Sequence, residues 1–163
     1  MSKYVINTNR RLLTLITSLT LLLSCSSIDC PVQTKVAVYY AVPDTLKDTL
    51  WVWTTRNDGN DTLLLNRGVK LTKFELPISH QNPEDTLIML VADTNQVWTI
   101  DTLFLAKEDI PHFESVDCGA HFFHRLTGLR YTRRGIDSIT LNTPSVNYDQ
   151  TVTNIIIRFK NRY

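Results

Sequence analysis

The feature that most constrains the fold is an alternation of apolar and polar side chains that begins near Thr34. Val36, Val38, Tyr40 and Val42 form one such series. Successive side chains of a β-strand point to opposite faces, whereas the apolar positions of a helix recur every three to four residues. The spacing therefore predicts a half-buried strand.

Short runs of the same kind recur along the chain, at residues 50–54, 63–65, 71–78, 87–91, 97–105, 136–141 and 155–159. Turn-forming residues separate them, including Asn57-Asp58-Gly59-Asn60 and Gln81-Asn82-Pro83. Residues 120–134 fit a short helix or an irregular strand, and we expect a strand with a bulge. The pattern predicts an all-β domain, an antiparallel two-sheet sandwich of the immunoglobulin-like kind.

The first 24 residues have the layout of a secretory signal peptide. Lys3, Arg10 and Arg11 precede an apolar run from Leu12 to Leu23. As a helix, these twelve residues would rise about 18 Å, which is short of the roughly 30 Å hydrocarbon core of a membrane. We expect the segment to direct export and then to be removed.

The apolar run ends in Leu22-Leu23-Ser24-Cys25, which resembles the lipobox of bacterial lipoproteins. The resemblance implies cleavage before Cys25, acylation of its thiol and new amine with chains such as palmitate, and anchoring to the cell envelope. Ser26 fits passage to the outer membrane, on its periplasmic or its surface side. The alternative is ordinary secretion with Cys25 unmodified. The expected organisation is a signal peptide (1–24), a lipidated tether (25–33) and a β-sandwich domain (34–163).

Charge and cysteine content bound the partners and the compartment. Removal of residues 1–24 leaves 139 of the 163 residues, enough for one ordinary domain. The removed segment contains three of the 17 basic side chains and none of the 16 acidic ones, so acidic side chains slightly outnumber basic ones in the rest of the chain. This balance does not indicate binding to nucleic acid. With Cys25 acylated, Cys30 and Cys118 remain, and an even pair in an oxidising compartment predicts a disulfide. Two unpaired buried thiols are the alternative.

Several segments resemble uncharacterised lipoproteins of gut Bacteroidales: Asn66-Arg67-Gly68-Val69, the stretch from Phe113 to His124, and the start formed by Cys25, Cys30 and Pro31. The likeness covers most of the mature domain. It implies a lipoprotein with a β-rich domain, and it implies no activity, ligand or cofactor.

The densest group of candidate metal ligands combines histidines with carboxylates: His112, Glu114, Asp117, His121 and His124. Such a set would suit zinc and a metal-dependent hydrolase. However, a spacing of three places His121 and His124 on opposite faces of a strand and aligns them only on a helix. We therefore expect surface histidines beside the buried pair Phe122 and Phe123, without metal or cofactor.

Motifs of other catalytic or ion-binding sites are missing from the sequence. There is no G-x-S-x-G nucleophile elbow, and none of the five glycines forms a G-x-G pair. Asp58-Gly59-Asn60-Asp61 has closely spaced oxygens but fails the EF-hand pattern, and a hairpin turn explains it. We do not expect an enzyme.

Two further groups of side chains suggest a binding function, one of arginines and one of aromatic residues. Arg125, Arg130, Arg133 and Arg134 could grip phosphate or an acidic glycan. A regular strand would place Arg130 and Arg134 on one face and the other two on the opposite face, so we expect a solvated hairpin.

The aromatic side chains Trp51, Trp53, Trp98 and Tyr131 could form the stacking surface of a module that binds a glycan or another small ligand. Trp51 and Trp53 share one face of a strand, and we expect that face to belong to the core.

An Asp-hydroxyl-apolar triplet occurs six times, with hydroxyl groups at Thr45, Thr49, Thr62, Thr86, Thr102 and Ser138. Asp at a turn, an outward Thr and an inward Leu would explain the triplet as the start of a strand. The triplet also resembles the O-glycosylation acceptor of Bacteroidota, and the two interpretations are compatible.

These observations favour a membrane-anchored structural or interaction module whose partner is another envelope protein or a glycan.

Overall fold

The computed structural model describes residues 35–55, 59–113 and 121–161. Within these residues the chain forms ten β-strands and no helix. Accordingly, no helix in this part of the chain is long and apolar enough to cross a membrane. Cys25, Cys30 and Cys118 lie outside the described residues, as do Glu114 and Asp117.

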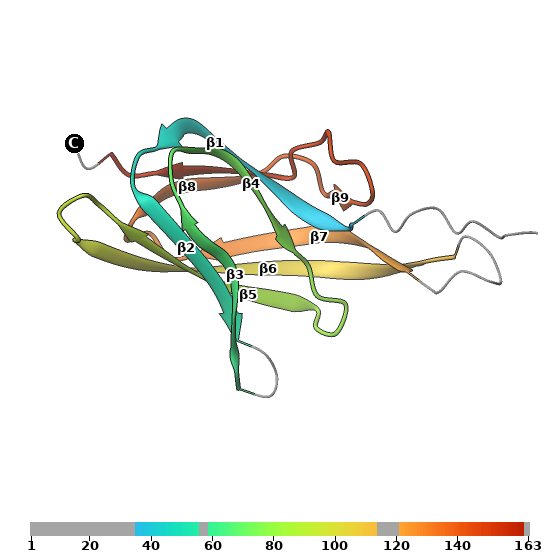
Figure 1. Ribbon diagram of the computed structural model, residues 1–163. Coiled ribbons are helices and arrows are strands. Elements are labelled where there is room, and N and C mark those ends of the chain that lie inside the picture. Colours follow the sequence, from blue (N-terminus) through green and yellow to red (C-terminus); the bar gives the residue numbers. More distant parts are fainter. Residues whose placement is uncertain (1–34, 56–58, 114–120, 162–163) are drawn as a thin grey trace, which may run out of the picture. The chain divides into compact units, whose positions relative to one another are not determined.

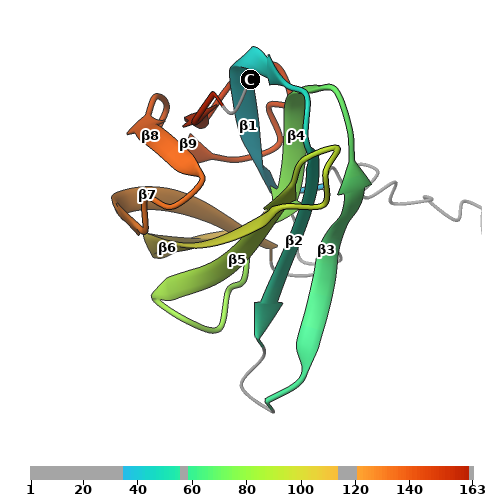
Figure 2. The same cartoon turned by 90° about the vertical axis from the view of Figure 1, so that its left-hand side faces the viewer.

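The strands form two sheets that pack face to face, as Figures 1 and 2 show, so the predicted two-sheet β-sandwich is confirmed. The smaller sheet contains, in spatial order, β4 (Leu71–Pro77), β1 (Ala37–Leu46), β10 (Ile155–Phe159) and β8 (Ile136–Leu141). The larger sheet contains β3 (Asp61–Gly68), β2 (Thr49–Thr55), β5 (Glu84–Ala92), β6 (Trp98–His112), β7 (His121–Tyr131) and β9 (Ser145–Val146).

Neighbouring strands are antiparallel with a single exception among the described pairs. The first strand, β1, and the last, β10, are parallel, and Tyr40 pairs with Ile155. Parallel neighbours need a long connection, and here the rest of the sandwich supplies it. The exception brings both ends of the domain into one sheet.

The core lies between the sheets and is built from alternate residues of each strand. On β2 the inward positions are Leu50 and Val52, both fully buried. Met89 of β5, which pairs with Val52, and Leu103 of β6, which pairs with Leu87, are fully buried as well. Apolar burial at these alternate positions is what holds a two-sheet sandwich together.

The predicted bulged strand at residues 120–134 is confirmed as β7. Ala106 of β6 pairs with Gly128, but the next residue, Lys107, pairs with Leu126. Thr127 is therefore an extra residue on β7, and it shifts the side-chain alternation of the strand by one position.

Gly59 and Asn60 lie where the sequence predicted a hairpin connection, between β2 and β3, while Asp58 lies outside the described residues. Gly59 has φ of 80°, a left-handed conformation that glycine adopts without steric cost. The β2–β3 hairpin projects beyond the other strands in both views (Figures 1 and 2).

Candidate functional site

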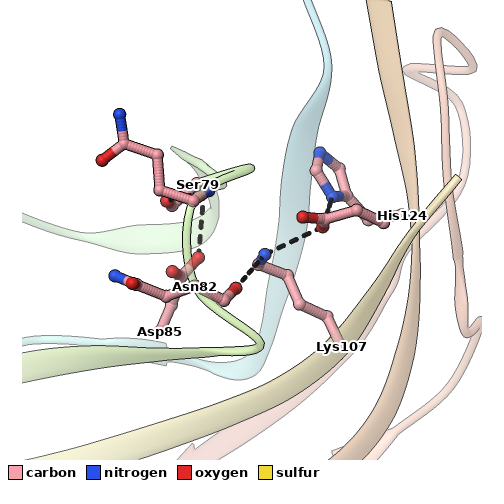
Figure 3. Close-up of polar contacts among 7 residues, drawn as sticks. Ser79, Asn82, Asp85, Lys107 and His124 are labelled. Atoms are coloured by element: carbon pink, nitrogen blue, oxygen red, sulfur yellow. Dashed lines mark hydrogen bonds and ion pairs between the residues drawn. The ribbon is translucent and has the colours of Figure 1, made fainter. Parts of the chain in front are cut away.

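A buried group of charged and polar side chains lies on the inner face of the larger sheet. Its members are Lys107 and Asp109 on β6 and His124 on β7, and we call them the polar cluster (Figure 3). Lys107 and Asp109 continue the inward alternation of Leu103 and Leu105. The inner face therefore changes from apolar to polar toward the end of β6.

The polar cluster is held together by one carboxylate oxygen. Asp109 Oδ1 accepts hydrogen bonds from Lys107 Nζ at 2.9 Å and from His124 Nδ1 at 2.7 Å. The Lys107 side chain is 0% exposed. Since a buried charge is stable only when it is paired, Asp109 is the partner that makes the burial of Lys107 possible.

The cluster sets the charge states of its members. Burial acts to raise the pKa of Asp109, but the bonds from Lys107 and His124 prevail and hold that pKa below its usual value. Burial lowers the pKa of His124 despite the opposing effect of Asp109. At neutral pH His124 is therefore uncharged, and its Nδ1–H donates to the ionised Asp109.

The polar cluster fastens the loop between β4 and β5 to the larger sheet. Lys107 Nζ donates to the carbonyl of Asn82, and the Lys107 backbone N–H donates to the carbonyl of Pro83 at 2.8 Å. In the same loop, the backbone N–H of Ser79 donates to Asp85 Oδ2 at 3.0 Å (Figure 3). These bonds fix the loop against the start of β5.

This loop forms one wall of a groove of about 810 Å³, which we call the polar groove. Its other walls come from the β2–β3 hairpin, the end of β4 and the start of β5, with Thr62, Pro77 and Asp85 among the lining residues. Burial raises the pKa of Asp85, although the Ser79 N–H and Lys107 act to lower it. The sequence drew attention to Asp85 only through its triplet and predicted no groove.

The outer face of the larger sheet carries all three tryptophans of the chain. Leu50 and Val52 point into the core, so Trp51 and Trp53 between and beside them point outward, and the expectation that these indoles belong to the core is wrong. Across the sheet, Trp51 pairs with Leu90, which in turn pairs with Ile100.

We call this surface the outer aromatic face. It comprises Trp51, Trp53, Leu63, Ile88, Leu90, Trp98 and Ile100. Trp98 is 62% exposed and Leu63 is 53% exposed, while the two other indoles are half-buried. By contrast, Tyr131 packs against the core, so it is not part of any exposed stacking surface.

The three histidines proposed as weak metal ligands do not converge. His112 pairs with His121 on the outer side of the sheet, where the two rings contact Tyr148 edge-on. His124 points inward to Asp109, so the prediction that His121 and His124 take opposite faces is confirmed. Among the described residues, no group of three or more His, Cys, Asp or Glu side chains is placed to hold a metal ion.

The arginine cluster is arranged differently from the expectation. Arg125 pairs with Glu108 and Arg130 with Phe104, and the residue inserted at Thr127 turns both arginines to the outer face. The predicted division between faces is therefore wrong for this pair, because it assumed regular alternation. Arg130 also binds Glu84 at 2.8 Å and lies 4.4 Å over the Phe104 ring.

The hydroxyl groups of the triplets follow the expected orientation at five of six positions. Thr45, Thr49, Thr86, Thr102 and Ser138 each precede a buried Leu or Ile. The triplet at Asp61 is reversed, since Leu63 is exposed and Thr62 lines the polar groove. Of the six hydroxyl-bearing residues, Thr45 alone is exposed, and the other five are half-buried.

The fold and these surfaces define the class of protein: a two-sheet β-sandwich with a polar groove at one side and an uncovered aromatic face. The chain belongs to DUF6452, a family of unknown function, which it matches over residues 49–159. Searches of the curated proteins and of the solved structures give no match.

Proposed function

We propose that this protein is a lipid-anchored interaction module of the bacterial cell envelope, and that it binds a partner protein through the outer aromatic face. The lipobox-like sequence ending at Cys25 supports the anchoring. The observation that carries the binding surface is the position of all three tryptophans on the solvent side of one sheet.

The composition of the outer aromatic face is that of a protein interface core. The outward positions of β2, β5 from Thr86 to Ala92, and β6 from Trp98 to Phe104 contain no charged side chain. Interface cores are depleted in charge and enriched in aromatic residues, and tryptophan is among the commonest hot-spot residues. Large exposed apolar patches mark interaction surfaces in soluble domains.

The binding surface is tested by photo-crosslinking in intact cells. A benzophenone amino acid at Thr102, which lies within the outer face, is expected to form an adduct with a partner protein. The same amino acid at Thr140, an exposed position of the smaller sheet, is the control. Absence of any adduct at Thr102 would overturn the assignment of this face.

A substitution at the most exposed indole makes the test specific. Trp98→Ala is expected to remove the Thr102 adduct without lowering the urea midpoint, because Trp98 buries little surface in the folded chain. Phe113→Ala is the matched control, since Phe113 is 64% exposed at the opposite end of β6 and lies outside the outer face. An adduct that survives in the Trp98 variant would contradict the proposed surface.

Anchoring is tested separately with labelled fatty acid. Cys25→Ala is expected to abolish incorporation of label and to release the chain from the membrane fraction. Retention of label in this variant would show that the lipid is not on Cys25.

A further inference from the structure

The polar groove lies on the side of the sandwich where neither sheet continues. β3 is the edge strand of the larger sheet and β4 is the edge strand of the smaller one, and residues of both line the groove. Its volume of about 810 Å³ is within the range of small-molecule binding sites, roughly 300–1,000 Å³. It is a different surface from the outer aromatic face.

The walls of the polar groove are rich in neutral hydrogen-bonding groups. Hydroxyl groups come from Thr62 and Ser79, and a side-chain amide comes from Gln81. Among the described residues that line the groove there is no lysine or arginine, and the charged ones are the acidic Glu84 and Asp85. Such a surface suits a ligand with many hydroxyl groups and no negative charge.

Part of this hydrogen-bonding capacity is unused within the described part of the chain. Asp85 Oδ2 accepts from the Ser79 N–H, and Oδ1 has no protein hydrogen bond there. The side chains of Gln81 and Thr62 likewise have none. A carboxylate fixed through one oxygen and half-buried presents its other oxygen as a strong acceptor for a ligand hydroxyl.

An aromatic ring stands at the border of the polar groove. His80 lines the groove and is exposed, and one face of its imidazole stacks on Phe122 with centroids 5.3 Å apart and planes 6° from parallel. The stack holds the imidazole of His80 in place. The Phe122 ring covers one face of the imidazole and leaves the other face uncovered. An immobilised aromatic face packs against the C–H face of a pyranose ring at little entropic cost.

We propose that the polar groove binds a neutral saccharide, with one sugar ring stacked on His80 and its hydroxyl groups bonded to Asp85 and Gln81. The proposal does not depend on the outer aromatic face, so either site can fail without the other.

The test uses the full-length protein in detergent, titrated with maltotriose, cellotriose, xylotriose and chitotriose. Binding is followed by amide chemical shifts and by calorimetry. At least one trisaccharide is expected to shift the amides of Thr62, Gln81 and Asp85. Trigalacturonate, which is anionic, is expected to bind more weakly than the best neutral sugar.

Two variants separate binding from folding. Asp85→Asn keeps an oxygen for the Ser79 N–H and is expected to weaken binding about tenfold or more, because a charge-assisted hydrogen bond is lost. Gln81→Ala changes an exposed side chain and is expected to weaken binding several-fold, whereas Gln150→Ala, at an exposed position outside the groove, is the matched control.

Three results would each overturn the proposal. They are no response to any of the four neutral sugars at millimolar concentration, shifts confined to the three indoles of the outer aromatic face, and unchanged affinity in both groove variants. Tighter binding of trigalacturonate than of every neutral sugar would also exclude a neutral ligand.

Discussion

Asp101 is a buried residue whose hydrogen bonds we expect to be disrupted by a substitution that hardly changes its shape. It lies on β6, is 2% exposed, and receives four hydrogen bonds from the turn between β7 and β8. Oδ1 accepts from Thr132 Oγ1 at 2.6 Å and Arg134 N at 2.7 Å. Oδ2 accepts from Gly135 N at 2.6 Å and Ile136 N at 2.9 Å.

Asp101→Asn keeps the shape but replaces one acceptor oxygen with a donor. The new amide group is expected to turn its oxygen toward Gly135 and Ile136, whose N–H groups are buried. The amide nitrogen then faces the Arg134 N–H, which loses its acceptor, and the Thr132 hydroxyl must reorient. One orphaned donor and the lost charge on the remaining bonds together cost about 2 to 3 kcal/mol.

Urea unfolding followed by tryptophan fluorescence measures this loss. A decrease of about 2 to 3 kcal/mol is a large share of the 5 to 15 kcal/mol typical of a single domain. Asp137→Asn is the matched control, because Asp137 is an exposed aspartate of the following strand and its ion pair with Arg133 is long, at 3.9 Å. That variant is expected to change stability by less than about 0.5 kcal/mol.

The pH dependence provides an independent check. Burial acts to raise the pKa of Asp101, but its four hydrogen bonds prevail and hold the pKa below the usual value. The stabilisation is therefore complete above the unfolded pKa of about 3.9 and is lost as pH falls through the lower folded pKa. The gap between wild type and Asp101→Asn should be full at pH 7 and should narrow below about pH 4. A gap under about 0.5 kcal/mol at pH 7 would refute the reasoning.

Three further predictions concern other parts of the chain. Lys107→Met is expected to lower stability by about 3 to 5 kcal/mol in urea unfolding, because it leaves the partly buried carboxylate of Asp109 without its cationic partner. The exposed Lys73→Met should have little effect, and equal midpoints for the two variants would contradict the buried ion pair. Cys30 and Cys118 are expected to form a disulfide that closes a loop of about 89 residues and adds about 4 to 5 kcal/mol; two thiols alkylated without reductant would disprove it. Thr45 is expected to carry an O-linked glycan in the native host, and glycopeptide mapping that finds it bare with full coverage would reject it.

Much of the sandwich could be read from single strands. The alternation along each strand sorted Leu50 and Val52 to one face and Trp51 and Trp53 to the other. These features depend on backbone geometry that every strand shares, so they require no knowledge of its neighbours.

The tertiary structure decided which face is covered. Alternation places Trp51 and Trp53 together but does not say which side of the sheet the second sheet will cover, and here that sheet covers the opposite side. Partners that meet across strands, such as Asp109 with His124, depend on pairing and register between segments 15 residues apart. The outer aromatic face, the polar cluster and the polar groove are therefore products of strand order and register, which alternation within one strand cannot specify.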